Sequence, residues 1–182
     1  MSGTPSSESD APARIAATTP DRGAMTTPAP SACVRVATRA DLDAVVAAVS
    51  DLLRELGSTP PPAAAMRHSA EALLADTGAG ALLLADADGA VVGVLSASWQ
   101  IAMHVPGRYA LIQDLWVDPA WRSRSVGSEL LARLFALARD LGMVRAEVGL
   151  PRESFPAIAA TEAFYRRNGF APLGPRMRRV FT

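Results

Sequence analysis

The amino-acid sequence predicts a mixed α/β domain that follows an unstructured leader. In several segments the apolar residues recur at helical spacing, and the short runs between these segments are apolar or alternate with polar residues, as strands do. The length of 182 residues suits one domain with a full core better than two. The predicted order of elements is β-α-α-β-β-β-α-β-α-β-β.

The amino-terminal segment is rich in Ser, Thr, Pro, Ala and Gly and has too little apolar periodicity to bury a face. We predict a disordered leader over residues 1–31 and a folded domain over residues 32–182. The leader also lacks the basic-then-apolar order of a secretory signal.

Overall composition excludes several classes of function. Apolar residues make up 49% of the chain, and 18 basic residues balance 18 acidic ones, so broad electrostatic capture of nucleic acid or membrane is not expected. No apolar run approaches the ~18 residues of a membrane span. The single cysteine, Cys33, cannot form an internal disulfide, and with two histidines a Cys/His metal site is not expected. We therefore expect a cytoplasmic protein without metal.

The first half of the domain is predicted to contain a strand, two helices and a hairpin. A short alternating strand at 34–37 precedes a helix over 41–56, which ends at a glycine and a run of prolines. A second helix is predicted over 63–76. Apolar runs at 81–85 and 91–99, joined by an Asp-Gly turn signal, predict a β-hairpin.

The second half is predicted to continue with alternating strands and helices. A Pro-Gly pair indicates a loop at 102–107, and a strand follows at 109–117. The longest apolar stripe predicts a helix over 126–141. A strand at 145–150 and a short helix over 159–167 come next. Two terminal strands complete the prediction, at 170–173 and 176–181.

The most informative segment is DLWVDPAWRSRSVGS at 114–128, which reads as strand, turn, loop of small residues and helix start. A helix amino terminus exposes unpaired N–H groups and the positive end of the helix dipole, so it suits a phosphate. Arg122 and Arg124 add charge and forked donors. The alternative interpretation is an ordinary helix cap preceded by solvated arginines.

Two motifs resemble the signatures of the GNAT acetyltransferase superfamily. Arg-Ser-Arg-Ser-Val-Gly at 122–127 is similar to the family's first signature, (Gln/Arg)-x-x-Gly-x-(Gly/Ala). Ala-Phe-Tyr-Arg-Arg-Asn-Gly-Phe at 163–170 is similar to its second signature, a Phe-Tyr pair on a short helix that ends in Gly-Phe. The likeness covers roughly residues 33–182. It implies the GNAT fold, a strongly bent mixed sheet of about six to seven strands with helices on both faces, split near the fourth and fifth strands.

The resemblance implies acetyl-coenzyme A as co-substrate. Backbone amides of residues 124–128 would hold its pyrophosphate, and the strand before the turn would offer backbone groups to the pantetheine arm. The residues so implied in cofactor binding are Leu115, Trp116, Val117, Arg122, Arg124, Ser125, Val126, Gly127, Ser128 and Phe164.

Three positions depart from the family pattern, and one of them is Ile158, near the place of an Asn that often precedes the Phe-Tyr helix. Ser125 stands where the family usually has Gly, and a positive φ there would cost about 1–2 kcal/mol of strain. Gln113 stands where relatives often have a Glu that deprotonates the amine, and Gln cannot take a proton. Asp114 is adjacent, but in a regular strand it would point to the opposite face.

For catalysis, the resemblance implies Tyr165 as the general acid that protonates the leaving thiolate. The alternative is a packed Tyr165 whose hydroxyl makes one structural hydrogen bond. Asp114 is a candidate for the base, and the base could equally be no side chain at all. Other candidates for this role are Asp51, Glu55, Glu71 and His104.

The sequence therefore predicts an N-acetyltransferase that moves the acetyl group of acetyl-coenzyme A to a primary amine of a small molecule by direct attack. One alternative is a regulatory module of the same fold that binds acyl-coenzyme A without catalysis. Others are a longer acyl donor, an alcohol acceptor or a protein amino terminus. The acceptor and the oligomeric state are left open, with a homodimer as one option.

Overall fold

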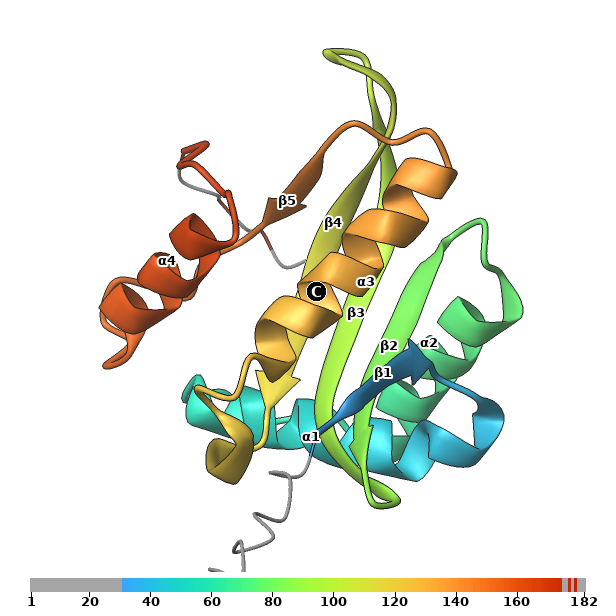
Figure 1. The fold of residues 1–182 in the computed structure, drawn as a ribbon, viewed down its shortest axis with the longest axis vertical. Coiled ribbons are helices and arrows are strands. Elements are labelled where there is room, and N and C mark those ends of the chain that lie inside the picture. The colour runs from blue at the N-terminus through green and yellow to red at the C-terminus, as the bar shows by residue number, and fades with distance from the viewer. Residues whose placement is uncertain (1–30, 175–176, 178, 180–182) are drawn as a thin grey trace, which may run out of the picture.

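One five-stranded sheet separates two sets of helices in the computed structural model, which describes residues 31–174, 177 and 179 (Figure 1). The predicted leader lies outside the described residues except for Ser31. The spatial order of the strands is their chain order, with antiparallel pairing throughout except for the parallel pair β4–β5. The strands are β1 (Cys33–Val36), β2 (Gly80–Ala87), β3 (Ala90–Ala102), β4 (Val105–Val117) and β5 (Ala146–Val148).

Four α-helices confirm the helical periodicity of the sequence, each with bounds within one residue of the expected ones. Short 3₁₀ turns at Arg39–Asp41 and Pro119–Trp121 precede α1 and α3. None of the helices in the described part of the chain is long and apolar enough to cross a membrane. The helices are α1 (Leu42–Glu55), α2 (Ala63–Ala75), α3 (Val126–Asp140) and α4 (Ile158–Arg167).

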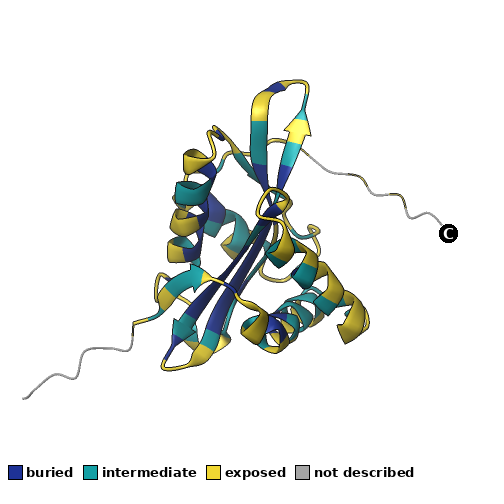
Figure 2. Cartoon of the chain, turned by 90° about the vertical axis from the view of Figure 1, so that its right-hand side faces the viewer, coloured by how far each residue is buried: buried dark blue, intermediate teal, exposed yellow. Residues whose placement is uncertain are grey.

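Alternation along the strands divides the core into two layers. On one face, Leu82, Leu84 and Trp116 pack with α1 and α2. On the other face, residues one position along the same strands, such as Leu83, pack against α3 and the aromatic side chains of α4. Figure 2 shows the buried residues concentrated along the central strands between the helices.

The hairpin between β3 and β4 differs from the loop expected at 102–107. The strands continue almost to the tip, where Met103 and His104 form the turn. A register shift between Ile101 and Ala102 leaves Pro106 and Gly107 without partners on β3. Proline therefore interrupts no ladder hydrogen bond, and the irregularity accommodates Gly107 at a φ of 76°.

The carboxyl-terminal strands are the other difference. Residues 170–174 form no strand, because Pro172 lacks a ladder donor and Phe170 packs against Phe135 and Tyr165. The strand expected at 145–150 is shorter, and the one expected at 176–181 lies largely outside the described residues. The described sheet therefore has five strands where about six to seven were expected, and the fold is otherwise the predicted one.

Candidate active site

A cleft opens where β4 separates from β5. The two strands pair only from Ala110 to Ile112, whereas β4 continues to Val117. The cleft has a volume of about 670 Å³ and is walled by β4, the turn after it, the start of α3, the end of β5, α4 and the end of α1. The predicted site residues that line it are Leu115, Trp116, Val117, Arg122, Ser125, Val126, Gly127, Ser128, Phe164 and Tyr165, whereas Asp114 and Arg124 do not.

The turn before α3 contains two residues with left-handed backbone and leads into the helix without a side-chain cap. Ser123 and Ser125 have φ values of 62° and 65°, in the left-handed region. Ser125 precedes the first helical residue, its side chain does not cap the helix, and its carbonyl accepts from Glu129. The amides of the first helical turn therefore have no intrahelical partner. Such amides fit a pyrophosphate.

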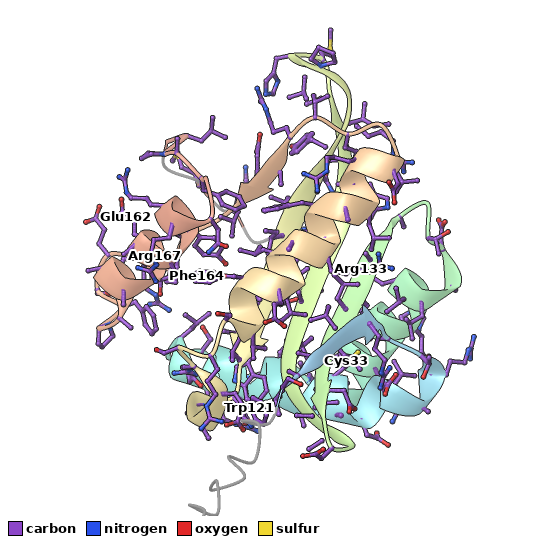
Figure 3. All side chains as sticks on the ribbon, in the orientation of Figure 1. Cys33, Trp121, Arg133, Glu162, Phe164 and Arg167 are labelled. Atoms are coloured by element: carbon purple, nitrogen blue, oxygen red, sulfur yellow. The ribbon has the colours of Figure 1, made fainter. Side chains whose placement is uncertain are left out.

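Gly127 allows α4 to close against the start of α3. A Cβ atom at this position would lie 3.1–3.2 Å from two atoms of the Phe164 ring. Phe164 extends from α4 toward α3 across this contact (Figure 3). The missing side chain thus sets the distance between the two helices that wall the cleft.

Two arginines of the turn and one of α4 differ in their partners. Arg122 donates through Nε to the Val117 carbonyl at 3.0 Å and through Nη2 to both carboxylate oxygens of Glu55 at 2.7 Å. Arg124 lies over the Trp121 ring, 5.2 Å from its centroid. Arg167 lines the cleft from α4 and has no ion pair or hydrogen bond with any described residue. The sequence reasoning missed Arg167, although its spacing of three from Phe164 places both on one helical face.

A β-bulge rearranges the side chains of β4 at the cleft. Ser96 pairs with Asp114 and Ala97 with Ile112, so Gln113 is an extra residue. Gln113 donates to the Ser98 hydroxyl at 2.8 Å, and the Ser96 hydroxyl donates to Asp114 at 2.5 Å.

Ser96 and Ser98 are two residues apart on one strand and therefore share a face. This face carries α1. The expectation that Asp114 points away from Gln113 was wrong, because the bulge puts both on the same face.

Burial distinguishes the two neighbours. Asp114 is partly buried and does not line the cleft, and burial raises the pKa of its carboxyl group, partly opposed by the hydrogen bond from Ser96. Gln113 is exposed and lines the cleft. A carboxyl group of raised pKa is a better proton acceptor than an ordinary Asp once it is ionised.

Tyr165 is 8% exposed and lines the cleft from α4. Its ring meets those of Phe164 and Phe170 edge-on, with centroids 5.1 and 5.3 Å away. Burial raises its pKa to about 12, so the hydroxyl stays protonated at neutral pH. Among the described residues this hydroxyl has no hydrogen-bond partner. The structural hydrogen bond of the alternative interpretation is therefore not seen in this part of the chain.

The other candidates for the catalytic base lie far apart on the fold. Glu55 lines the cleft, whereas Asp51 pairs with Arg54 on the exposed side of α1. Glu71 lies on α2, and His104 lies at the hairpin tip. The described residues include no group of three or more His, Cys, Asp or Glu that could hold a metal ion.

Comparison with solved structures places the fold among acetyltransferases. A possible acetyltransferase from Clostridium difficile 630 superimposes with a TM-score of 0.69 at 18% identity, over 84% of this chain and 98% of that chain. The aminoglycoside N-acetyltransferase AAC(6')-Iy, in complex with a bisubstrate analogue, superimposes with a TM-score of 0.70 at 17% identity. The match covers 83% of this chain and 98% of that chain. Glucosamine-6-phosphate N-acetyltransferase from Arabidopsis thaliana superimposes with a TM-score of 0.67 at 13% identity, over 84% of this chain and 99% of that chain. These likenesses show the fold.

The sequence comparison identifies the family. Residues 46–170, more than half of the chain, match the model of the Acetyltransferase (GNAT) family. The chain belongs to this family of acyltransferases, which use acetyl-coenzyme A. A search of curated proteins found no match.

Because Ser125 has a left-handed backbone conformation, we expect glycine substitutions at Ser125 and Ser128 to change the stability of the fold in opposite directions. Replacing Ser125 by Gly is expected to stabilise the fold by about 1 kcal/mol, because glycine adopts this φ without strain. Ser128→Gly in the first turn of α3 is the control and is expected to destabilise by about 0.5 kcal/mol. Urea unfolding measures both changes, and a Ser125→Gly protein less stable than the parent contradicts the strain argument.

Proposed function

We propose that this protein is an N-acetyltransferase that moves the acetyl group of acetyl-coenzyme A to a primary amine of a small molecule. The observation that supports it best is the cleft between β4 and β5, with the free amides of α3 at one end and the Tyr165 ring in its wall. A strand edge, a helix amino terminus and an acid-capable hydroxyl are the groups that a thioester of a nucleotide cofactor requires.

Each part of the cofactor has a counterpart in the cleft. The amides of residues 124–128 would hold the pyrophosphate, with Arg122, Arg124 and Arg167 adding positive charge. The free edge of β4 at Leu115, Trp116 and Val117 would hydrogen-bond the pantetheine amides as an added strand would. Phe164 would pack against the arm from α4.

The reaction is a direct transfer. The neutral amine nitrogen attacks the thioester carbonyl, a C–N bond forms, and a backbone amide of β4 stabilises the oxyanion. The intermediate then collapses, the C–S bond breaks, and Tyr165 donates its proton to the thiolate sulfur. The proton lost by the amine passes to a base, which restores the balance.

Asp114 is the base that this proposal favours. Its carboxyl group lies on the α1 face and belongs to the residue that follows Gln113. Since Asp114 does not line the cleft, the proton would reach it through a water molecule. Gln113 donates to Ser98 through its amide nitrogen, so its carbonyl oxygen is free to accept from the amine and to orient it.

Gln113 also favours a second candidate function, a module that binds acyl-coenzyme A without catalysis. The two functions are separated by titrating the protein with acetyl-coenzyme A in a calorimeter and then measuring thiol release with a panel of amines. Saturable binding together with amine-dependent thiol release is the expected result. Binding without release on any amine supports the module, and absence of binding by well-folded protein contradicts both.

Tyr165→Phe tests the general acid. We expect kcat to fall by about 10²–10⁴-fold, because the thiolate loses its proton donor. The affinity for acetyl-coenzyme A and the stability are expected to stay close to those of the parent, since the hydroxyl holds no hydrogen bond among the described residues. Phe170→Leu serves as a packing control. A Tyr165→Phe protein with parental kcat would exclude the role.

Asp114→Asn tests the base and has a pH signature. Burial raises the folded-state pKa of Asp114 above its ordinary value of 3.8, so the protonated form is favoured and the fold loses stability as pH rises through the folded-state pKa. Asn carries no charge and can still accept from Ser96. The variant is therefore expected to be more stable than the parent at pH 7, with a difference that vanishes below about pH 4.

The kcat of the same variant is expected to fall by about 10²–10⁴-fold. The decrease of kcat toward acidic pH that protonation of Asp114 causes in the parent is expected to disappear. A weakly basic amine is the acceptor of choice, because its own protonation then does not mask this decrease. Parental turnover in Asp114→Asn would show that the proton leaves by another route.

A further inference from the structure

A second pocket adjoins the cleft at the end of α1. It has a volume of about 360 Å³ and lies between the end of α1 and the loop that leads from β5 to α4. Three residues, Glu55, Leu56 and Phe155, line both this pocket and the cleft. The two cavities are therefore adjacent, with these side chains between them, so a ligand that reaches this end of the cleft comes close to the pocket.

The pocket lies on the acceptor side of the sheet. Helix α3, with its phosphate-binding amides, covers one face, and α1 covers the other. A thioester threaded between β4 and β5 from the α3 face presents its carbonyl toward the α1 face, where Gln113 lines the cleft. A nucleophile approaching from this side would have its remote end near Glu55 and Leu56.

The charged side chains near the end of α1 differ in whether they have a partner of opposite charge. Glu55 is the only carboxylate among the described residues that line the two cavities. Its charge is already balanced, because both of its oxygens accept from Arg122 at 2.7 Å. A cation arriving here would have to compete with a guanidinium at hydrogen-bond distance.

Arg152 is the unbalanced charge of the pocket. Within the described part of the chain its guanidinium has no ion pair and no hydrogen bond. Its neighbour Glu153 does not line either cavity. Leu56, Phe155 and Pro156 contribute apolar side chains to the wall, so the pocket combines one unpaired guanidinium group with apolar surface.

From these contacts we infer that the acceptor is an amine that also carries an anionic group, a carboxylate or a phosphate, which Arg152 binds in the pocket beside Glu55. This inference rests on the proposed transferase function and narrows its substrate class. Arg152 would form a forked, charge-assisted pair with either anion. A polycationic amine, such as an aminoglycoside, finds no unpaired carboxylate among the described residues of these walls.

Matched pairs of amines test the charge preference. Phenylalanine is compared with phenylalaninamide, glucosamine 6-phosphate with glucosamine, and neamine represents the polycations. Binding of each to the protein saturated with coenzyme A is measured by calorimetry, and thiol release from acetyl-coenzyme A is measured in parallel. The two pairs distinguish a carboxylate from a phosphate as the favoured anion.

We expect the anionic member of at least one pair to bind about tenfold more tightly than its neutral partner. Arg152→Gln is expected to remove this preference by weakening the anionic member only. Arg133→Gln is the matched control: Arg133 lies on α3, away from both cavities, and has no described partner (Figure 3). This control is expected to keep the preference.

Equal binding within both pairs, an unchanged preference in Arg152→Gln, or tightest binding of neamine would overturn the inference. Thiol release restricted to neutral or cationic amines would overturn it as well and leave the proposed transferase intact. Conversely, Arg152-dependent binding of anions without thiol release on any amine would support the pocket and contradict the transferase.

Discussion

The early end of the pairing between β4 and β5 is the constraint on which the rest of the site depends. Five residues of β4 continue beyond Ile112, with one edge held by β3 and the other facing the cleft. A backbone edge that is fixed on one side can recognise an extended ligand on the other without rearrangement. The same separation brings the end of α1, the start of α3 and α4 together around one cavity.

Several local features of the site work against the stability of the fold. Ser123 and Ser125 adopt left-handed conformations that glycine would adopt without strain, and Asp114 is partly buried without a cationic partner among the described residues. Strained backbone and desolvated charge concentrate at functional sites, because selection retains them only where they serve a ligand or a reaction. In this chain both occur within the segment that leads from β4 into α3.

The helix positions, the order of elements along the chain and the two sequence motifs could be predicted because each depends on periodicity or on local residue types. The bulge at Gln113 could not, since a slip of one residue in register leaves no mark in the alternation of so short a segment. Its consequence, the shared face of Gln113 and Asp114, was therefore missed. The Arg122–Glu55 pair was also unpredictable, because it joins residues 67 positions apart. The end of β5 and the stretch after Phe170 were misjudged where apolar residues serve packing instead of strand pairing.

The likeness to solved acetyltransferases is a likeness of fold, in the layout of the sheet and the helices. A fold fixes where a thioester can be threaded, whereas a few side chains at the rim decide which amine reaches it. Here one of those side chains, Glu55, is turned from a potential cation binder into half of an ion pair by Arg122. Because Arg122 also donates to the carbonyl of Val117, the turn proposed to bind the cofactor and the wall proposed to face the acceptor are joined through one guanidinium. We therefore expect a change in that side chain to alter the proposed acceptor pocket and the proposed phosphate-binding turn together, which couples the two halves of the proposed site.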